Sequence, residues 1–473
     1  MAQPSRARLA GSPSQVNMTV LQPGQRTPLK ALAWQGEVRR LVLAAEADDP
    51  ALWDPPTRPR GQGPPRYFQY PAMMVAEVQR TVLGIVRACV PAIDSLVDPF
   101  VGSGTTLTEA MRLGMSACGQ DINPLAVLIA TVSTSLPDPD GLADTAERVM
   151  RSRIGAVELS PNMPPGAAAK WFGPKVLHDL GATAASIRTV ANVEERRFLW
   201  VALAETVRLC SNSRTSTYKL HIRPAEELPR VPQVDETFDA ILARNISELR
   251  RFRGELESQG RLQGGRYKSR VEVSYGDTRK TVKPGHDILL TSPPYGDNSS
   301  TVPYGQASYL ALAWVDFDDI SVSVPRELLE STLRIDHRSL GGSLPRRPWR
   351  EYAASAIDRS AALRTSLARL DGVPRDRAQR VATFVADLDS TLDPILAALR
   401  PGAPMVWTIG NRRVGTFEVP LITIVRELLS SRGCEPVVGV RRQIRGKRMA
   451  TRNSIAATMR YEEVLVLRGP DQL

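Results

Sequence analysis

Short apolar runs that stop at turn residues recur along the chain and predict the strands of a buried sheet. One run, Ile288 to Leu290, follows Asp287 and ends at residues 291–295, Thr-Ser-Pro-Pro-Tyr. The other predicted strands cover residues 95–98, 115–121, 270–275, 404–409, 437–440 and 463–468. Because helices are predicted between several of these strands, the pattern indicates an α/β fold.

Apolar residues at helical spacing predict the intervening elements. Helices are expected over residues 29–45, 105–113, 142–156, 170–193, 195–210, 381–399 and 419–431, and in a segment that includes 310–314. Three of them fall between the strands at 115–121 and 270–275, which predicts a mostly helical insertion. Its aromatic residues Trp171, Phe172 and Trp200 are expected to anchor a core rather than to stack on bases, because aromatic side chains are so often buried.

Residues 292–295 give the strand at 288–290 a rigid end. Pro293 and Pro294 fix φ and remove two N–H donors, and Pro293 biases Ser292 toward extended geometry. The strand end therefore presents a hydroxyl group, carbonyl groups and the ring of Tyr295 at the carboxyl edge, where open α/β sheets bind ligands. The alternative is a proline-stiffened loop that carries a surface tyrosine.

A second strand ends in residues 98–106, Asp-Pro-Phe-Val-Gly-Ser-Gly-Thr-Thr. Gly102 and Gly104 leave room for a ligand near the backbone. Asp121, at the end of the next strand, is placed to bind both ribose hydroxyls of a nucleoside. The loop lacks the lysine of an ATPase phosphate loop and has Leu107 in the place of a third glycine, so a nucleoside cofactor without a pyrophosphate is favoured.

Together, the two segments resemble those of the S-adenosylmethionine-dependent site-specific DNA amino-methyltransferases, the N4-cytosine and N6-adenine family of the Thr-Ser-Pro-Pro-Tyr type. That family has an Asp-Pro-Phe-x-Gly-Ser-Gly-Thr-Thr loop, matched by residues 98–106, and a [Ser/Asp/Asn]-Pro-Pro-Tyr segment, matched by residues 292–295. Residues 70–80 look like the family's helix at the methionine end of the cofactor, and Asp277 looks like the acid near its adenine. The resemblance implies a Rossmann-like S-adenosylmethionine methyltransferase sheet.

The resemblance also implies a role for each matched residue. Cofactor contacts are expected from Tyr70, Pro71, Asp98, Pro99, Phe100, Gly102, Ser103, Gly104, Thr105, Thr106, Asp121, Asn123 and Asp277, and catalysis from Ser292, Pro293, Pro294 and Tyr295. An exocyclic amine is a weak nucleophile because its lone pair is delocalised into the ring. Two acceptors, such as Ser292 Oγ and the Pro293 carbonyl, would hold its N–H groups and direct the lone pair at the methyl group, while Tyr295 stacks on the flipped-out base.

Serine at position 292 favours cytosine N4 as the methylated atom, because aspartate or asparagine is usual there in the family's N6-adenine enzymes. Transfer to carbon 5 of cytosine is not expected, because no cysteine follows a proline in this chain. The expected activity is therefore methylation of cytosine N4 in double-stranded DNA, in a restriction–modification or similar system with a separately encoded endonuclease. Adenine N6, an RNA base and a protein glutamine amide are alternative targets, and a nucleic-acid-binding module without transfer is the non-enzymatic alternative.

This interpretation divides the chain into six parts. Residues 1–63 form a flexible N-terminal arm, 64–130 the cofactor-binding part and 268–318 the catalytic part of the methyltransferase domain, 377–473 the rest of its sheet, and 131–267 and 319–376 two insertions. Either insertion is a candidate target-recognition region, because such regions vary within the family.

The charge balance suits a polyanionic partner. Sixty-one lysine and arginine residues against 50 acidic residues give a net charge of +11, and each neutralised phosphate releases counterions; an arginine-rich proteome would give the same balance. Phosphate contacts are expected from the acid-free loop after residue 440, through Arg441, Arg442, Arg445, Lys447 and Arg448, and from Arg346 and Arg347 of the second insertion. The alternative for the loop is a solvated hairpin.

Cysteine usage favours a reducing cytoplasm. Cys89, Cys118, Cys210 and Cys434 are scattered without metal or redox spacing, so no metal site is expected. No apolar run reaches membrane-spanning length, and the N-terminal residues lack the hydrophobic segment of a signal peptide. A cytoplasmic protein without a membrane partner is expected.

Overall fold

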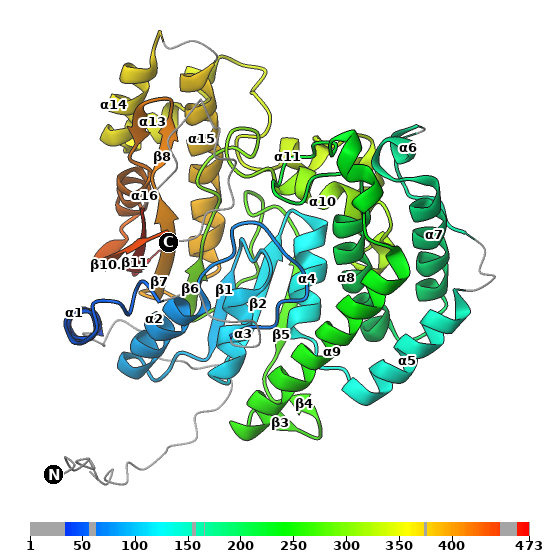
Figure 1. The fold of residues 1–473 in the computed structure, drawn as a ribbon. Helices are drawn as coiled ribbons and strands as arrows, with labels where there is room; N and C mark the ends of the chain where they lie inside the picture. Colours follow the sequence, from blue (N-terminus) through cyan, green and yellow to red (C-terminus); the bar gives the residue numbers. More distant parts are fainter. Residues whose placement is uncertain are drawn as a thin grey trace, which may run out of the picture.

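A seven-stranded sheet in the order β10-β11-β7-β6-β1-β2-β5 forms the centre of the protein (Figure 1). The strands are β1 (Ser95–Asp98), β2 (Ser116–Asp121), β5 (Val271–Tyr275), β6 (Ile288–Thr291), β7 (Pro404–Gly410), β10 (Glu435–Gln443) and β11 (Tyr461–Arg468). Strands β5, β2, β1, β6 and β7 are parallel, and β11 is antiparallel to both of its neighbours. This confirms the predicted fold class: an α/β protein with a Rossmann-like methyltransferase sheet.

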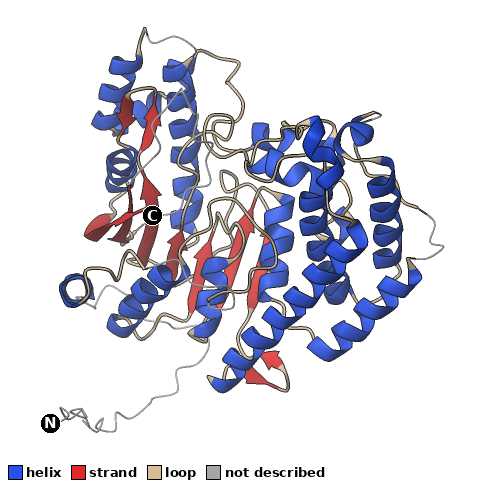
Figure 2. Ribbon diagram, viewed as in Figure 1, coloured by secondary structure: helices blue, strands red, loops and turns tan. Residues whose placement is uncertain are grey.

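Helices surround the sheet and build the two insertions (Figure 2). This computed structural model describes residues 34–55, 63–153, 158–164, 166–372, 376–444 and 461–472. Its helices are α1 (Trp34–Asp48), α2 (Ala76–Cys89), α3 (Thr105–Arg112), α4 (Pro124–Thr134), α5 (Pro139–Ser152), α6 (Ala167–Trp171), α7 (Pro174–Arg188), α8 (Val193–Cys210), α9 (Val234–Ser258), α10 (Tyr304–Leu312), α11 (Arg334–Arg338), α12 (Trp349–Tyr352), α13 (Ala354–Arg359), α14 (Ala361–Leu370), α15 (Arg377–Ala397) and α16 (Leu421–Ser430). The described residues also form two small hairpins, β3 (Leu262–Gln263) with β4 (Arg266–Tyr267) and β8 (Arg412–Val414) with β9 (Phe417–Val419), and three short 3-10 helices, η2 (Ala225–Arg230), η3 (Phe317–Asp319) and η4 (Arg326–Leu329).

Both faces of the central sheet are covered. Every residue of β6 and of β7 is buried, although successive side chains of a strand point to opposite faces. This double burial explains the apolar run at 288–290 and the run at 404–409, in which Thr408 is the one polar residue. The core around them includes residues of α2, α15 and α16, so the middle of the sheet is held between helices.

Residues 34–55 pack into this core, which corrects the expectation that the whole of 1–63 is a flexible arm. Trp34, Val38 and Val42 recur at a spacing of four along α1 and are buried against α2 and β10, and Trp53 is buried beside them. The apolar stripe is short and lies in a polar segment, so only its tertiary partners show that it is a core element. Residues 1–33 and 56–62 lie outside the described residues.

The helical insertion forms a second core beside the β5 edge of the sheet (Figure 1). Helices α5 to α9 lie between β2 and β5 in sequence, and their apolar faces pack with α4 and α10. Trp171, Phe172 and Trp200 are buried in this core, as predicted. Residues 319–376, the predicted second insertion, include α11 to α14, of which α12, α13 and α14 pack on α15. Across the described part of the chain, no helix combines the length and apolar character needed to span a bilayer.

Candidate active site

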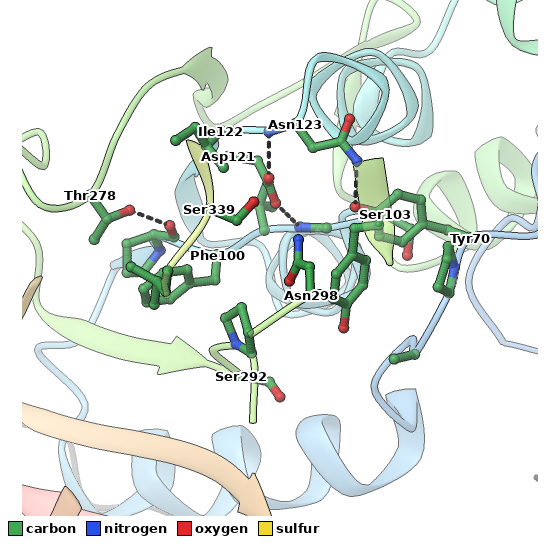
Figure 3. A pocket seen from close by; sticks show the side chains of 18 of the residues that line it. Tyr70, Phe100, Ser103, Asp121, Ile122, Asn123, Thr278, Ser292, Asn298 and Ser339 are labelled. Carbon is green, nitrogen blue, oxygen red and sulfur yellow. Dashed lines mark hydrogen bonds between the residues drawn. The ribbon is translucent and has the colours of Figure 1, made fainter. Parts of the chain in front are cut away.

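The carboxyl ends of four parallel strands, β5, β2, β1 and β6, meet at one cavity (Figure 3). Its empty space, counted together with the part open to solvent, is about 860 Å³. Of the predicted site residues, its lining includes Tyr70, Pro71, Pro99, Phe100, Gly102, Ser103, Thr105, Asp121, Asn123, Asp277, Ser292 and Pro294. Residues from both predicted segments therefore line a single hollow.

Asp98 connects the glycine loop and the start of α3 with the end of β6. The carboxylate is fully buried and accepts hydrogen bonds from Thr106 Oγ1 at 2.6 Å, Thr291 Oγ1 at 2.7 Å and the Phe100 N–H at 3.1 Å. Burial raises the pKa of Asp98 to about 6, and these three donors limit the rise. Asp98, Gly104 and Thr106 thus hold the loop in place, and none of the three lines the cavity.

The glycines of the loop have the backbone geometry that a close-fitting turn requires. Gly102 and Gly104 have φ of +51° and +84°, in the left-handed region that favours glycine. A Cβ on Gly104 would lie 3.1 Å from Ala130 Cα, a tight contact that a larger residue could make only if α3 and α4 moved slightly apart. The turn keeps the backbone of Gly102 open to the cavity.

Asp121 receives a backbone N–H on each carboxylate oxygen. The Gly102 N–H donates to Oδ2 and the Asn123 N–H to Oδ1, both at 2.9 Å (Figure 3). Each carboxylate oxygen has a second lone pair, so the group can still accept from a pair of ligand hydroxyls. Burial raises the pKa of Asp121 to about 6, and the backbone donors act in the opposite direction.

Asn123 ties the loop after β2 to Tyr70 at the cavity rim and to Ser308 of α10. Its Nδ2 donates to Tyr70 Oη at 3.1 Å and to Ser308 Oγ at 2.8 Å, and its Oδ1 caps α4. Tyr70 and Tyr304 are stacked with centroids 5.9 Å apart. Burial raises the pKa of both tyrosines, so both phenols stay neutral.

Asp277 is the one predicted acid whose charge is neutralised by a direct ion pair. Burial alone would raise its pKa, but Arg279, at 2.9 Å from Oδ2 and 3.0 Å from Oδ1, holds the pKa below its ordinary value. Arg279 also pairs with Asp387 on α15 and lines the cavity. The acid at this end of the cavity is therefore ionised and fixed.

The proline segment presents Ser292 to the cavity and turns its tyrosine hydroxyl inward. Ser292 and Pro294 line the hollow, and Pro293 is buried. The Tyr295 hydroxyl lies 3.1 Å from Ser292 Oγ and also contacts the Thr408 carbonyl at 3.3 Å and Glu462 Oε2 at 3.2 Å. Tyr295 is thus anchored by its tip to β7 and β11.

Asn298 is a cavity residue that no sequence motif indicated. Its Nδ2 donates to Asp336 Oδ1 at 2.8 Å, and because a carboxylate only accepts, this bond fixes the orientation of the amide. Asn298 is 1% exposed, and its Oδ1 lacks a hydrogen-bond partner among the described residues, although the residue lines the cavity. A buried, unpaired acceptor of this kind suits an N–H group of a ligand.

The predicted phosphate contacts have different positions. Arg346, Arg347 and Arg441 are exposed, whereas Arg445, Lys447 and Arg448 lie outside the described residues. Arg442 is 8% exposed, forms an ion pair with Glu462, and donates to the Trp53 carbonyl at 3.2 Å. The prediction that Arg442 contacts phosphate is therefore corrected: its guanidinium binds Glu462 and the Trp53 carbonyl inside the protein. The neighbouring cations in the sequence gave no sign of this.

A basic hairpin in the helical insertion was missed. Residues 211–223 contain no acidic residue, and a bridge between Ser213 and Ile222 holds the base of the hairpin. Arg214 and Lys219 are exposed on it. The Leu220 N–H donates to Gln306 Oε1 of α10, which places the hairpin beside the helix that begins at Tyr304 on the cavity rim. The acid-free composition was the signal that could have revealed it.

The fold and the cavity define a Rossmann-like methyltransferase architecture, and comparison with known proteins agrees. No protein-family model matches the chain. The Type II methyltransferase M.MvaI of Kocuria varians is 28% identical over 432 residues, which cover 85% of this chain and 90% of the relative. The Type II methyltransferase M.MjaII of Methanocaldococcus jannaschii is 51% identical over 39 residues, 8% of this chain and 7% of that protein. The chain is thus homologous to a Type II methyltransferase over most of both lengths, which supports methyltransferase activity.

Among solved structures, the rRNA methyltransferase aviRa of Streptomyces viridochromogenes covers 85% of this chain and 89% of its own, at 11% identity and a TM-score of 0.28. A likeness of that strength supports no conclusion about fold or function.

Proposed function

We propose that this protein is a site-specific DNA methyltransferase that transfers a methyl group from S-adenosylmethionine to N4 of a flipped-out cytosine. The observation that carries the proposal is the shared cavity: Ser292 and Pro294 line the same hollow as Gly102, Asp121 and Asp277. The similarity to M.MvaI supports a DNA substrate and a restriction–modification setting with a separately encoded endonuclease.

The residues present fit S-adenosylmethionine, which supplies an electrophilic methyl group on a sulfonium sulfur. Asp121 retains lone pairs for two ribose hydroxyls, and the Gly102 backbone leaves room beside it. Asp277 can accept from an adenine amino group, since Arg279 keeps it ionised. Tyr70 and Pro71 line the same cavity and would contact the methionine part.

Ser292 is placed to receive the amine of the target base. Its Oγ and the Pro293 carbonyl would accept the two N–H groups, which favours a pyramidal nitrogen whose lone pair faces the methyl group. The base would be flipped out of the duplex, because its amine is otherwise buried in pairing. The ring of Tyr295 would stack on the base while its hydroxyl stays anchored to Glu462. A serine at position 292 is the feature that favours cytosine N4 over adenine N6.

The test is incubation of the purified protein with S-adenosylmethionine labelled with tritium in the methyl group, together with plasmid DNA, tRNA or a protein mixture. Label in DNA is expected, and mass analysis of the digested nucleosides should show N4-methylcytosine. N6-methyladenine would move the proposal to the adenine reaction. Label confined to RNA or protein would overturn the DNA assignment, and no label in any substrate would favour a binding module without transfer.

A further inference from the structure

A chain of hydrogen bonds runs from the cavity to the last strand of the sheet. Ser292 Oγ contacts the Tyr295 hydroxyl at 3.1 Å, and that hydroxyl contacts Glu462 Oε2 at 3.2 Å and the Thr408 carbonyl at 3.3 Å. Glu462 in turn pairs with Arg442, across from it on β10. The side chains of Glu462 and Arg442 are 12% and 9% exposed, so this ion pair is largely sheltered from water.

The ion pair between Glu462 and Arg442 fixes the direction of the hydrogen bonds that lead to Ser292. An arginine side chain is always charged and only donates, so its partner Glu462 is held as an acceptor. The Thr408 carbonyl also only accepts. Tyr295 has one hydroxyl proton, and these two acceptors can be satisfied by the tyrosine only if that proton is directed to them. The Tyr295 oxygen is then left to accept the proton of Ser292.

The direction of these hydrogen bonds determines which groups Ser292 presents to the cavity. A serine hydroxyl has one proton and two lone pairs. With the proton directed to Tyr295, only lone pairs are directed to the cavity. Ser292 is then an acceptor and not a donor, although a free serine can be either.

We propose that Glu462, acting through Tyr295, is a positioning residue that fixes Ser292 as a hydrogen-bond acceptor and so selects a base with an amino group. This rests on the proposed methyl transfer to an amine. The amino group of cytosine donates two hydrogen bonds, whereas the carbonyl oxygen that uracil and thymine carry at the same ring position would place its lone pairs against those of Ser292. The orientation of the Ser292 hydroxyl thus discriminates between bases, because a base with a carbonyl oxygen at this position would leave polar groups unpaired.

The test uses the full chain with three variants on a duplex that contains the methylated site, mapped beforehand with the wild-type protein. Glu462→Gln allows the direction of the hydrogen bonds from Ser292 through Tyr295 to reverse, because an amide can donate as well as accept. Tyr295→Phe keeps the ring and the Glu462–Arg442 pair but removes the relaying hydroxyl. The matched control is Glu463→Gln, which makes the same change one position along β11 and removes a pair with Arg426 instead.

Both relay variants should lower the single-turnover rate of transfer about 10- to 100-fold, the size expected for removing one oriented hydrogen bond from the transition state. S-adenosylmethionine affinity should stay within about twofold of the wild type, because the cofactor residues are unchanged. Wild-type protein should bind the duplex with cytosine at the target position more tightly than the duplex with uracil there, and Tyr295→Phe should narrow that difference. The control should match the wild type in all three measurements.

The double variant Glu462→Gln/Tyr295→Phe separates a relay from two independent effects. If Glu462 acts through Tyr295, the double variant should be no slower than the slower single variant. Rate reductions that multiply, or a Tyr295→Phe variant as fast and as selective as the wild type, would overturn the relay. These outcomes differ from a failure of the proposed function, in which the wild-type protein itself transfers no methyl group.

Discussion

Thr291 donates a hydrogen bond of 2.7 Å from its hydroxyl to the carboxylate of Asp98, although 193 positions separate the two residues. Thr291 ends β6 directly before Ser292, and Asp98 ends β1 at the start of the glycine loop. The bond therefore ties the proposed base side of the cavity to the proposed cofactor side. In the proposed reaction, a shift of either strand end would change the distance over which the methyl group has to pass.

The first prediction concerns this bond. Thr291→Val keeps the shape of the side chain but removes one of three donors to a buried carboxylate, so unfolding free energy should fall by about 1–3 kcal/mol and the pKa of Asp98 should rise further above about 6. Thr383→Val is the matched control, because Thr383 is equally buried and its hydroxyl has no hydrogen-bond partner among the described residues. Urea unfolding measures the free energy of unfolding of both variants, and an equal loss of stability in the two would contradict the role of the bond.

The second prediction concerns Gly104. Gly104 and Gly166 each precede a helix with φ near +80°, but a Cβ on Gly104 meets the backbone of Ala130, whereas a Cβ on Gly166 meets nothing within 4 Å. Gly166→Ala should cost about 1 kcal/mol for the left-handed backbone, and Gly104→Ala about 1–3 kcal/mol more for the collision. Calorimetry should also show weaker S-adenosylmethionine binding for Gly104→Ala alone. Comparable destabilisation of both variants would show that backbone strain, and not the close approach to α4, sets the requirement.

The third prediction is a pH dependence of cofactor affinity. If ionised Asp121 binds the ribose, affinity should be constant above its pKa of about 6 and fall about tenfold from pH 7 to pH 5. Stability should change in the opposite direction. The pKa of Asp121 is about 6 in the folded chain, compared with an ordinary value of 3.8 in the unfolded chain. Ionisation of Asp121 therefore lowers the free energy of unfolding as pH rises from about 4 to 6.

Titration calorimetry across this range, with Asp121→Asn as the comparison, measures the effect. The Asp121→Asn variant should bind S-adenosylmethionine weakly, and its affinity should depend less on pH. Any remaining pH dependence would report Asp98, whose pKa is also about 6. An unchanged slope in Asp121→Asn would exclude Asp121 as the titrating group.

The fourth prediction tests whether either predicted insertion contacts DNA, the substrate of the proposed function. The double variant Arg346→Ala/Arg347→Ala removes cations of the second insertion, and Arg214→Ala/Lys219→Ala removes those of the hairpin in the first. For every phosphate that a variant no longer neutralises, the slope of log affinity against log salt should become shallower by about 0.9. Arg151→Ala, on α5 and paired with Glu147, is the control and should leave the slope unchanged. If both double variants keep the wild-type slope, neither insertion binds the DNA backbone through these residues.

Much of the architecture was predictable because it is encoded locally. The apolar runs at 288–290 and 404–409 predict buried strands, and the structure places β6 and β7 there. The glycine loop at 98–106 and the prolines at 293 and 294 follow from φ restrictions that act within a few residues. Parallel strands share one carboxyl edge, so even the meeting of Ser292 with Gly102 could be expected from sequence once the fold class was known.

The tertiary structure alone decided how side chains pair across the sheet. Glu462 contacts Tyr295 from 167 positions away, Asn298 is oriented by Asp336, and Arg442 is turned inward from a run of cations that resembles a phosphate-binding surface. These pairings depend on strand order and register, which are set by packing the whole chain, and no periodicity near any one residue records them. The sequence by itself determined which groups stand at the strand ends, and packing determined which of their protons and lone pairs face the cavity.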